Sequence, residues 1–94
     1  MRVQLEFFGL SRLATGTKEL ALDLEETTTF RDIVRLLGTQ YPKMLENVIN
    51  PDGETLHPPN IFNVNAKKMI KPDQMDQCPD DGDRIILMSV SAGG

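Results

Sequence analysis

Cysteine is almost absent from the 94-residue chain, since Cys78 is the only one. No disulfide can form within the chain, which excludes the disulfide-stapled class of small secreted domains. Long apolar runs are also missing, and none approaches the ~20 residues that a membrane-spanning helix requires. The N-terminal segment alternates polar and apolar residues and lacks the apolar core of a signal peptide. We therefore expect a cytoplasmic protein that has no membrane partner.

Basic residues are few and scattered. The chain has 10 lysines and arginines against 14 acidic residues, a net charge of −4, and its only adjacent basic pair is Lys67-Lys68. A nucleic-acid binder of this size normally carries a basic stripe, so we expect no nucleic-acid partner. A chain this short builds one modest core, with little room for a deep pocket holding both substrate and catalytic groups. We therefore expect a protein that is not itself an enzyme.

The first half of the chain predicts two strands and one helix. Alternation of apolar and polar residues indicates strands at 2–8 and 18–25, joined by a connector at 10–17 with Gly16 at a turn. An apolar stripe with helical spacing then begins after Thr29, a good N-cap, and ends before Pro42. The stripe comprises Phe30, Ile33, Val34, Leu37 and Tyr41.

The second half predicts shorter elements. We expect a helical turn at 44–49, a chain reversal at 50–53 and a strand at 60–64 that buries Ile61 and either Phe62 or Val64. A tight turn at 65–66 should lead into a short strand at 67–70, followed by a polar segment at 72–82. The last strand, at 84–90, is apolar over most of its length, as expected of a central strand buried on both faces.

The resulting order, β-β-α-β-β-β, predicts an α+β fold. One main helix packs on one face of a mixed sheet of four or five strands, the two-layer arrangement of the β-grasp fold. Residues 1–90 form this domain, and residues 91–94 form an exposed, flexible C-terminal tail.

The tail Ala92-Gly93-Gly94 carries the candidate chemistry. A terminal carboxylate is ionised at neutral pH, and it can attack the α-phosphate of ATP to give an acyl-adenylate that sulfide, a thiolate or an amine can attack. Glycine has no Cβ, so such a tail can pass through a narrow channel in a partner enzyme. Six extended residues, 89–94, span about 20 Å, which is enough to reach a buried site.

Three features together resemble a known family: the strand order, the ending DDGDRIILMSVSAGG and the segment INPDGETLHPPNIFNVNAKKM. They are similar to the MoaD/ThiS group of ubiquitin-like sulfur carriers, over the whole chain. The Asp52-Gly53 insertion resembles the longer members, such as CysO-type carriers and small archaeal modifier proteins. The ending lacks the proline pair that is common in the molybdopterin branch.

The resemblance implies a β-grasp carrier with no catalytic residues and no bound cofactor of its own, monomeric when free. Its E1-like adenylyltransferase partner uses ATP to activate Gly94, which becomes a thiocarboxylate, while Gly93 and Ala92 thread into the partner's active site. A second partner takes the sulfur: a molybdopterin-synthase large subunit, a thiamine-type enzyme, or a cysteine or methionine synthase. Two alternatives remain open: a protein modifier that forms isopeptide bonds through Gly94, and a plain β-grasp interaction module.

Other reactive side chains suggest no second site. His57, the only histidine, lies in a proline-flanked loop without a serine, cysteine or carboxylate partner at a catalytic spacing. We expect a surface role for it and an incidental role for Cys78. Three aspartates at 80–83 lack the ligand spacing of a calcium loop, so we expect a solvated turn and no metal. Methionines 44, 69, 75 and 88 should fill the core or its rim, and some should face a partner from the open side of the sheet.

Overall fold

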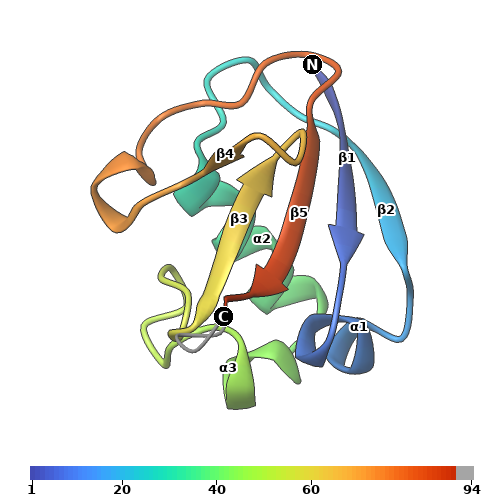
Figure 1. The fold of residues 1–94 in the computed structure, drawn as a ribbon, viewed down its shortest axis with the longest axis vertical. Coiled ribbons are helices and arrows are strands. Elements are labelled where there is room, and N and C mark those ends of the chain that lie inside the picture. The colour runs from blue at the N-terminus through green and yellow to red at the C-terminus, as the bar shows by residue number, and fades with distance from the viewer. Residues whose placement is uncertain (91–94) are drawn as a thin grey trace.

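The first and last strands lie side by side at the centre of the fold and run parallel. The structure is a computed structural model that describes residues 1–90. Its five-stranded sheet has the order β2-β1-β5-β3-β4, with only the β1–β5 pair parallel (Figure 1). The strands are β1 (Arg2–Phe7), β2 (Glu19–Asp23), β3 (Asn60–Val64), β4 (Lys68–Met69) and β5 (Arg84–Ser89). This mixed sheet with a helix packed on it confirms the predicted β-grasp architecture.

The core lies between the sheet and the helix α2 (Phe30–Gln40). Thr29 caps this helix as predicted: its hydroxyl accepts the Asp32 N–H, and the Asp32 carboxylate accepts the Thr29 N–H. The two remaining N–H groups of the first turn, from Phe30 and Arg31, donate to carbonyls of Gln77 and Met75. Every orphan donor at this end therefore has a partner, and the segment that follows β4 is tied to the start of the helix.

Alternation places the apolar side chains of the strands on the helix side of the sheet. Val3, Leu5 and Phe7 of β1 are buried there, beside Ile85 and Leu87 of β5. Ile86, on the opposite face of β5, is only 7% exposed. The prediction of a central strand buried on both faces is therefore confirmed over most of β5.

The segment 10–17, expected to be a plain connector, contains a short helix, α1 (Leu10–Thr15). Gly9 enters it with φ of 61°, and Gly16 ends it in the left-handed conformation, its N–H bonded to the Arg12 carbonyl. The Thr15 hydroxyl donates to the Ser11 carbonyl. The prediction missed this helix because it has no apolar stripe facing the core: Leu10 and Leu13 are exposed and only Ser11 is buried.

Segment 43–59 folds as a compact unit beside α2. The helix α3 (Met44–Asn47) confirms the expected helical turn. The chain then doubles back, so that Asn50 N–H bonds to the Thr55 carbonyl and His57 N–H to the Val48 carbonyl. The reversal predicted at residues 50–53 is confirmed, and Val48 and Ile49 are buried.

The expectation for β3 was partly wrong. Phe62 is fully buried on the helix side, whereas Ile61 is half-buried on the opposite face. Neighbouring residues of a strand point to opposite faces, so the pair could not both enter one core. The turn after β3 forms as expected, with Asn65 and Ala66 at positive φ, but β4 is confined to two residues. No helix among residues 1–90 combines the length and apolar character needed to cross a membrane.

Two adjacent leucines of α2 offer a matched test of this packing. Leu37 is fully buried, whereas Leu36 is 38% exposed. We expect Leu37→Ala to lower the free energy of unfolding by about 2–5 kcal/mol through lost burial and a residual cavity. Leu36→Ala should cost under about 1 kcal/mol, since leucine and alanine have similar helix propensity. Urea unfolding of both variants measures the difference; equal losses would contradict the described core.

Candidate functional site at the end of the last strand

The candidate site lies where the central strand β5 ends, at the edge of the sheet that is formed by the ends of the strands. Because β1 and β5 are parallel, both finish at this edge, and the antiparallel β3 begins there (Figure 1). The turn before β5 and the N-terminus lie at the opposite edge, where Gly82 N–H bonds to the Arg2 carbonyl. Ala92, Gly93 and Gly94, the predicted reactive tail, lie outside the described residues. What the structure describes is the frame from which the tail departs.

One side of this frame joins β1, α1 and β5 through a buried serine. Phe8 N–H donates to the Leu87 carbonyl at 3.1 Å. The Ser11 hydroxyl, 1% exposed, lies 2.8 Å from the Phe8 carbonyl and 3.1 Å from the Leu87 carbonyl. It also accepts the Phe8 N–H. These bonds extend the parallel pairing past the end of β1, so that β5 is held firmly up to its last residues.

The other side of the frame joins β5 to the start of β3. Val90 N–H donates to the Pro59 carbonyl at 3.0 Å. The buried Asn60 side chain donates to the carbonyls of His57, at 2.7 Å, and Asn47, at 3.3 Å, and its oxygen accepts from the Ser89 hydroxyl at 3.3 Å. Asn60 therefore fixes segment 47–59 and the base of the tail in one arrangement.

The sheet face opposite α2 has an apolar band that reaches this edge. Phe8 and Met69 are 45% and 54% exposed, and Ile61 and Met88 are half-buried. Strand alternation places all four on the face away from the core, whereas Met44 and Met75 belong to the core. Two of the four methionines thus fill the core as expected, and the other two, Met69 and Met88, lie on the open sheet face. Phe8, Ile61, Met69 and Met88 together form an apolar surface that reaches the base of the tail.

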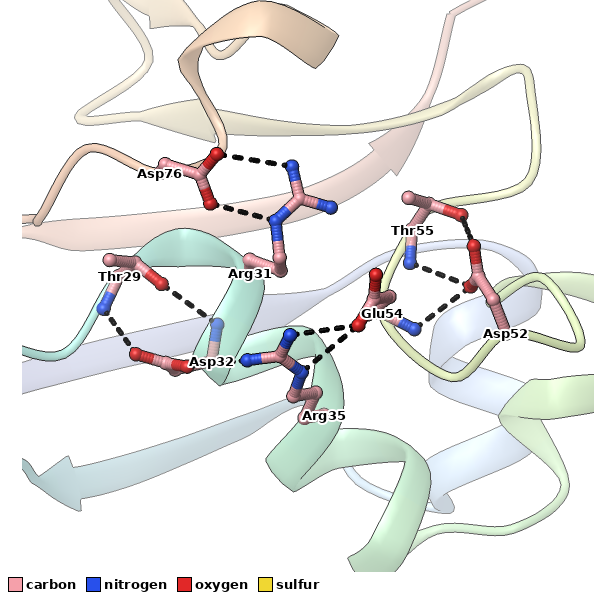
Figure 2. Close-up of polar contacts among 8 residues, drawn as sticks. All are labelled: Thr29, Arg31, Asp32, Arg35, Asp52, Glu54, Thr55 and Asp76. Atoms are coloured by element: carbon pink, nitrogen blue, oxygen red, sulfur yellow. Dashed lines mark hydrogen bonds and ion pairs between the residues drawn. The ribbon is translucent and has the colours of Figure 1, made fainter.

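Ion pairs hold two loops against the first turns of α2 (Figure 2). The Arg31 guanidinium contacts the Asp76 carboxylate at 2.7 Å, and Arg35 contacts Glu54 at 2.8 Å and Asp32 at 3.0 Å. The hydrogen bond from Arg31 holds the pKa of Asp76 below its ordinary value. The pKa of Asp32 is also lowered, first by the Thr29 N–H and then by the Thr29 hydroxyl.

Asp52 organises the inserted loop in the same way. Its carboxylate accepts the N–H groups of Glu54 and Thr55 at 2.9 and 3.0 Å, and the Thr55 hydroxyl at 2.7 Å (Figure 2). The pKa of Asp52 is lowered, first by the Glu54 N–H and then by the Thr55 hydroxyl. These carboxylates are therefore engaged in holding loops in place and are not gathered around a reactive centre.

The other candidate residues occupy the structural roles expected for them. His57 is exposed, with Nδ1 3.1 Å from the Asn50 side-chain oxygen. Cys78 is exposed in the loop before β5. Asp81 and Asp83 accept hydrogen bonds within and around their turn, from Arg2 N–H and Asp80 N–H respectively. No group of metal-ligating side chains occurs within residues 1–90.

Sequence reasoning missed the residues that frame the tail. Ser11, Asn60 and Pro59 come from three distant parts of the chain, and each acts through a hydrogen bond to β5 or its neighbour. The only local signal was a polar residue inside or beside an apolar pattern, as at Asn60 before Ile61-Phe62. Such a residue becomes informative only when its buried partners are known.

Comparison with known proteins supports the resemblance. No family model matches the chain. Small archaeal modifier protein 3 of Haloferax volcanii is 29% identical over 94 residues, covering all of both chains. The crystal structure of SAMP1 from Haloferax volcanii matches with a TM-score of 0.78 at 18% identity, again over all of both chains. The solution structure of Urm1 from Trypanosoma brucei matches with a TM-score of 0.75 at 27% identity, covering 99% of this chain and 95% of that one.

The chain has the ubiquitin-like β-grasp fold. Its resemblance to the sulfur-carrier and modifier family is confirmed by the full-length similarity and by the shared fold. Together they support a role as a sulfur carrier or a protein modifier.

The Arg31–Asp76 pair predicts a specific pH dependence. The folded pKa of Asp76 lies below its unfolded value, so the pair stabilises the fold above the unfolded pKa. That contribution disappears as the pH falls through the folded pKa. In Arg31→Met, whose side chain has a similar length but no hydrogen-bond donor, the pKa of Asp76 should rise towards the ordinary value of an aspartate. Carbon-13 NMR titration of the carboxyl groups measures it.

Asp32 is the internal control for this titration. Its pKa is lowered chiefly by the Thr29 N–H, which Arg31→Met leaves in place. Its titration should therefore stay depressed in the variant. An unchanged Asp76 titration would show that the ion pair in Figure 2 does not persist in solution.

Proposed function

We propose that the protein is a sulfur carrier that acts through the carboxylate of Gly94. The observation that carries the proposal is the position of the tail. Ser91 to Gly94 come directly after Val90, which is hydrogen-bonded to Pro59 beside the end of the central strand. A partner that binds the rigid edge of the sheet would thus receive the terminal glycines at a defined place.

The chemistry begins with activation. The Gly94 carboxylate attacks the α-phosphorus of ATP in the active site of an E1-like enzyme, and pyrophosphate leaves. A sulfide-equivalent nucleophile then attacks the acyl carbon of the adenylate, the bond to AMP breaks, and a thiocarboxylate remains on Gly94. Gly93 and Ala92 give this tail a narrow cross-section for the enzyme's channel. The protein itself contributes no catalytic group and binds no cofactor.

The loaded thiocarboxylate is a sulfur donor for biosynthesis. Its acceptor is an enzyme that builds a sulfur-containing cofactor, of the molybdopterin or thiamine type, or one that makes cysteine or methionine. The missing proline pair before Gly93-Gly94 favours an acceptor other than molybdopterin synthase. We propose that the free carrier is a monomer that meets these two enzymes in turn.

Removing one residue tests the activation step. Deletion of Gly94 should abolish ATP–pyrophosphate exchange by the E1-like enzyme of the same organism, because the chain then ends at Gly93 and its carboxylate falls about 3.5 Å short of the nucleotide. Urea unfolding should be unchanged, since every described core residue precedes Ser91. The matched control is Ser91→Ala, which keeps the length of the tail and should retain exchange. Adenylation of the Gly94-deleted chain, or normal growth of cells expressing residues 1–91 alone, would refute the proposal.

A protein-modifier function is the second candidate, favoured by the similarity to small archaeal modifier protein 3. In this function a lysine amine attacks the same adenylate, or a thioester derived from it, and forms an isopeptide bond. The two candidates are separated by what the activated Gly94 becomes in cells. A modifier predicts high-mass conjugates that disappear on Gly94 deletion, detected by immunoblot.

The sulfur carrier instead predicts a thiocarboxylate on the protein purified from cells. The mass of the thiocarboxylated protein lies close to that of the protein with one oxidised methionine. The chain has five methionines, so mass alone does not separate the two. Selective alkylation of the thiocarboxylate, in a Cys78→Ser background, distinguishes the two. Conjugates without any alkylatable thiocarboxylate would assign the modifier function in place of the carrier function.

A further inference from the structure

An apolar pocket opens beside the base of the tail. Its walls come from the inserted segment, the start of β3 and the chain that follows β4. The lining residues are Thr55, Leu56, Pro58, Pro59, Asn60, Ile61, Ile70, Pro72 and Met75. The pocket exists because β4 is short: the chain bonds to β3 through Ile70 N–H and the Phe62 carbonyl, then turns away at Pro72. The first residues of β3 therefore have an apolar hollow where a longer β4 would have lain.

The size and lining of the pocket indicate what it can hold. Its volume is about 230 Å³, below the ~300–1,000 Å³ typical of small-molecule sites. None of the residues that line the pocket carries a charge, so the lining offers no carboxylate or amine to bind a polar ligand. One or two aliphatic side chains fit this space and this chemistry better than a free metabolite does. The pocket is therefore suited to an anchoring side chain from another protein.

The position of Val90 indicates that this other protein is the enzyme that activates Gly94. Pro59 forms part of the pocket wall and also accepts the Val90 N–H, so the pocket adjoins the point where the tail begins. Four residues separate Val90 from the end of Gly94, and fully extended they reach about 14 Å. An enzyme that activates Gly94 must bring its nucleotide site within that distance. Its surface must then cover the sheet edge around Pro59.

We propose that this pocket receives an aliphatic or methionine side chain of the enzyme that activates Gly94. The inference rests on the proposed adenylation of Gly94 and assigns a role to the inserted segment 50–59. That segment forms the pocket wall, and the Asp52 turn together with the Arg35–Glu54 ion pair holds it in position. Anchoring at the pocket raises the affinity for the enzyme without touching the reacting atoms.

Two substitutions of lining residues test the pocket. Pro72 is exposed and belongs to no strand of the sheet, whereas Ile61 lies on β3, so that Ile61→Glu affects both the pocket and the open sheet face. Leu36→Glu, on the exposed side of α2, is the matched control. The readout is ATP–pyrophosphate exchange by the purified E1-like enzyme as a function of carrier concentration, with urea unfolding to confirm that each variant is folded.

We expect Pro72→Glu and Ile61→Glu each to raise KM about tenfold or more, the size typical of losing an anchoring contact. Their kcat should be unchanged, because the tail is intact, and Leu36→Glu should match the wild type. A raised KM for Ile61→Glu alone would place the enzyme on the open sheet face and overturn the pocket. An unchanged KM for both variants would also overturn the pocket proposal. So would a Pro72→Glu substitution that changes only the self-association of the carrier.

A chain lacking Gly94 separates docking from chemistry. It should support no exchange, yet it should inhibit exchange by the wild-type carrier, and Pro72→Glu in the same background should weaken that inhibition about tenfold. Equal inhibition by the two chains would overturn the pocket while leaving the adenylation of Gly94 intact. If the wild-type carrier supports no exchange at all, the proposed function fails, and the pocket inference fails with it.

Discussion

The rest of the structure depends on the parallel pairing of β1 with β5. This pairing requires the last strand to enter at the edge where the chain begins, so the polypeptide must cross the molecule between them. β2, antiparallel to β1, makes the first return to that edge, and α2, segment 43–59 and β3 then cross the molecule and come back to it (Figure 1). Since β5 is bonded to β1 on one side and to β3 on the other, it has no free edge. Because β5 is hydrogen-bonded along both sides, it is held in place up to its last residue.

That constraint explains why polar residues are buried at the end of β5. The sheet ladder stops there, and backbone groups that lack a strand partner would otherwise be left unsatisfied away from water. Ser11 donates to a carbonyl of β5, that of Leu87, whereas Asn60 donates to the carbonyls of His57 and Asn47 and accepts from the Ser89 hydroxyl. Both side chains are almost fully buried. The frame of the tail is thus built from hydrogen bonds around the last residues of β5, and it shares Pro59 and Asn60 with the apolar pocket.

The sequence predicts the elements that make local patterns and misses those that depend on distant partners. A few neighbouring residues are enough to predict the apolar stripe from Phe30 to Leu37, the Thr29 cap and the turns after Asn50 and Asn65. The helix α1 does not, because Ser11 is its only buried residue and is held by a carbonyl of β5. The wrong assignment of Ile61 has a similar origin, since strand alternation gives two possible faces and only the partner strand decides between them. The role of Gly93 and Gly94 stays a prediction, because it rests on the chemistry of a terminal glycine carboxylate and on its position after the last strand, and residues 91–94 lie outside the described residues.

The pairing of β1 with β5 also separates the two ends of the chain. Met1 lies at the opposite edge from Val90, with its amino group bonded to the Leu24 carbonyl at 2.6 Å, in a molecule whose longest dimension is 32 Å (Figure 1). An affinity tag, a fluorophore or a surface tether joined to Met1 would therefore start from the end of the sheet opposite to Val90. The fold thus allows the protein to be immobilised or fused through its first residue while the surface around Val90 is left uncovered.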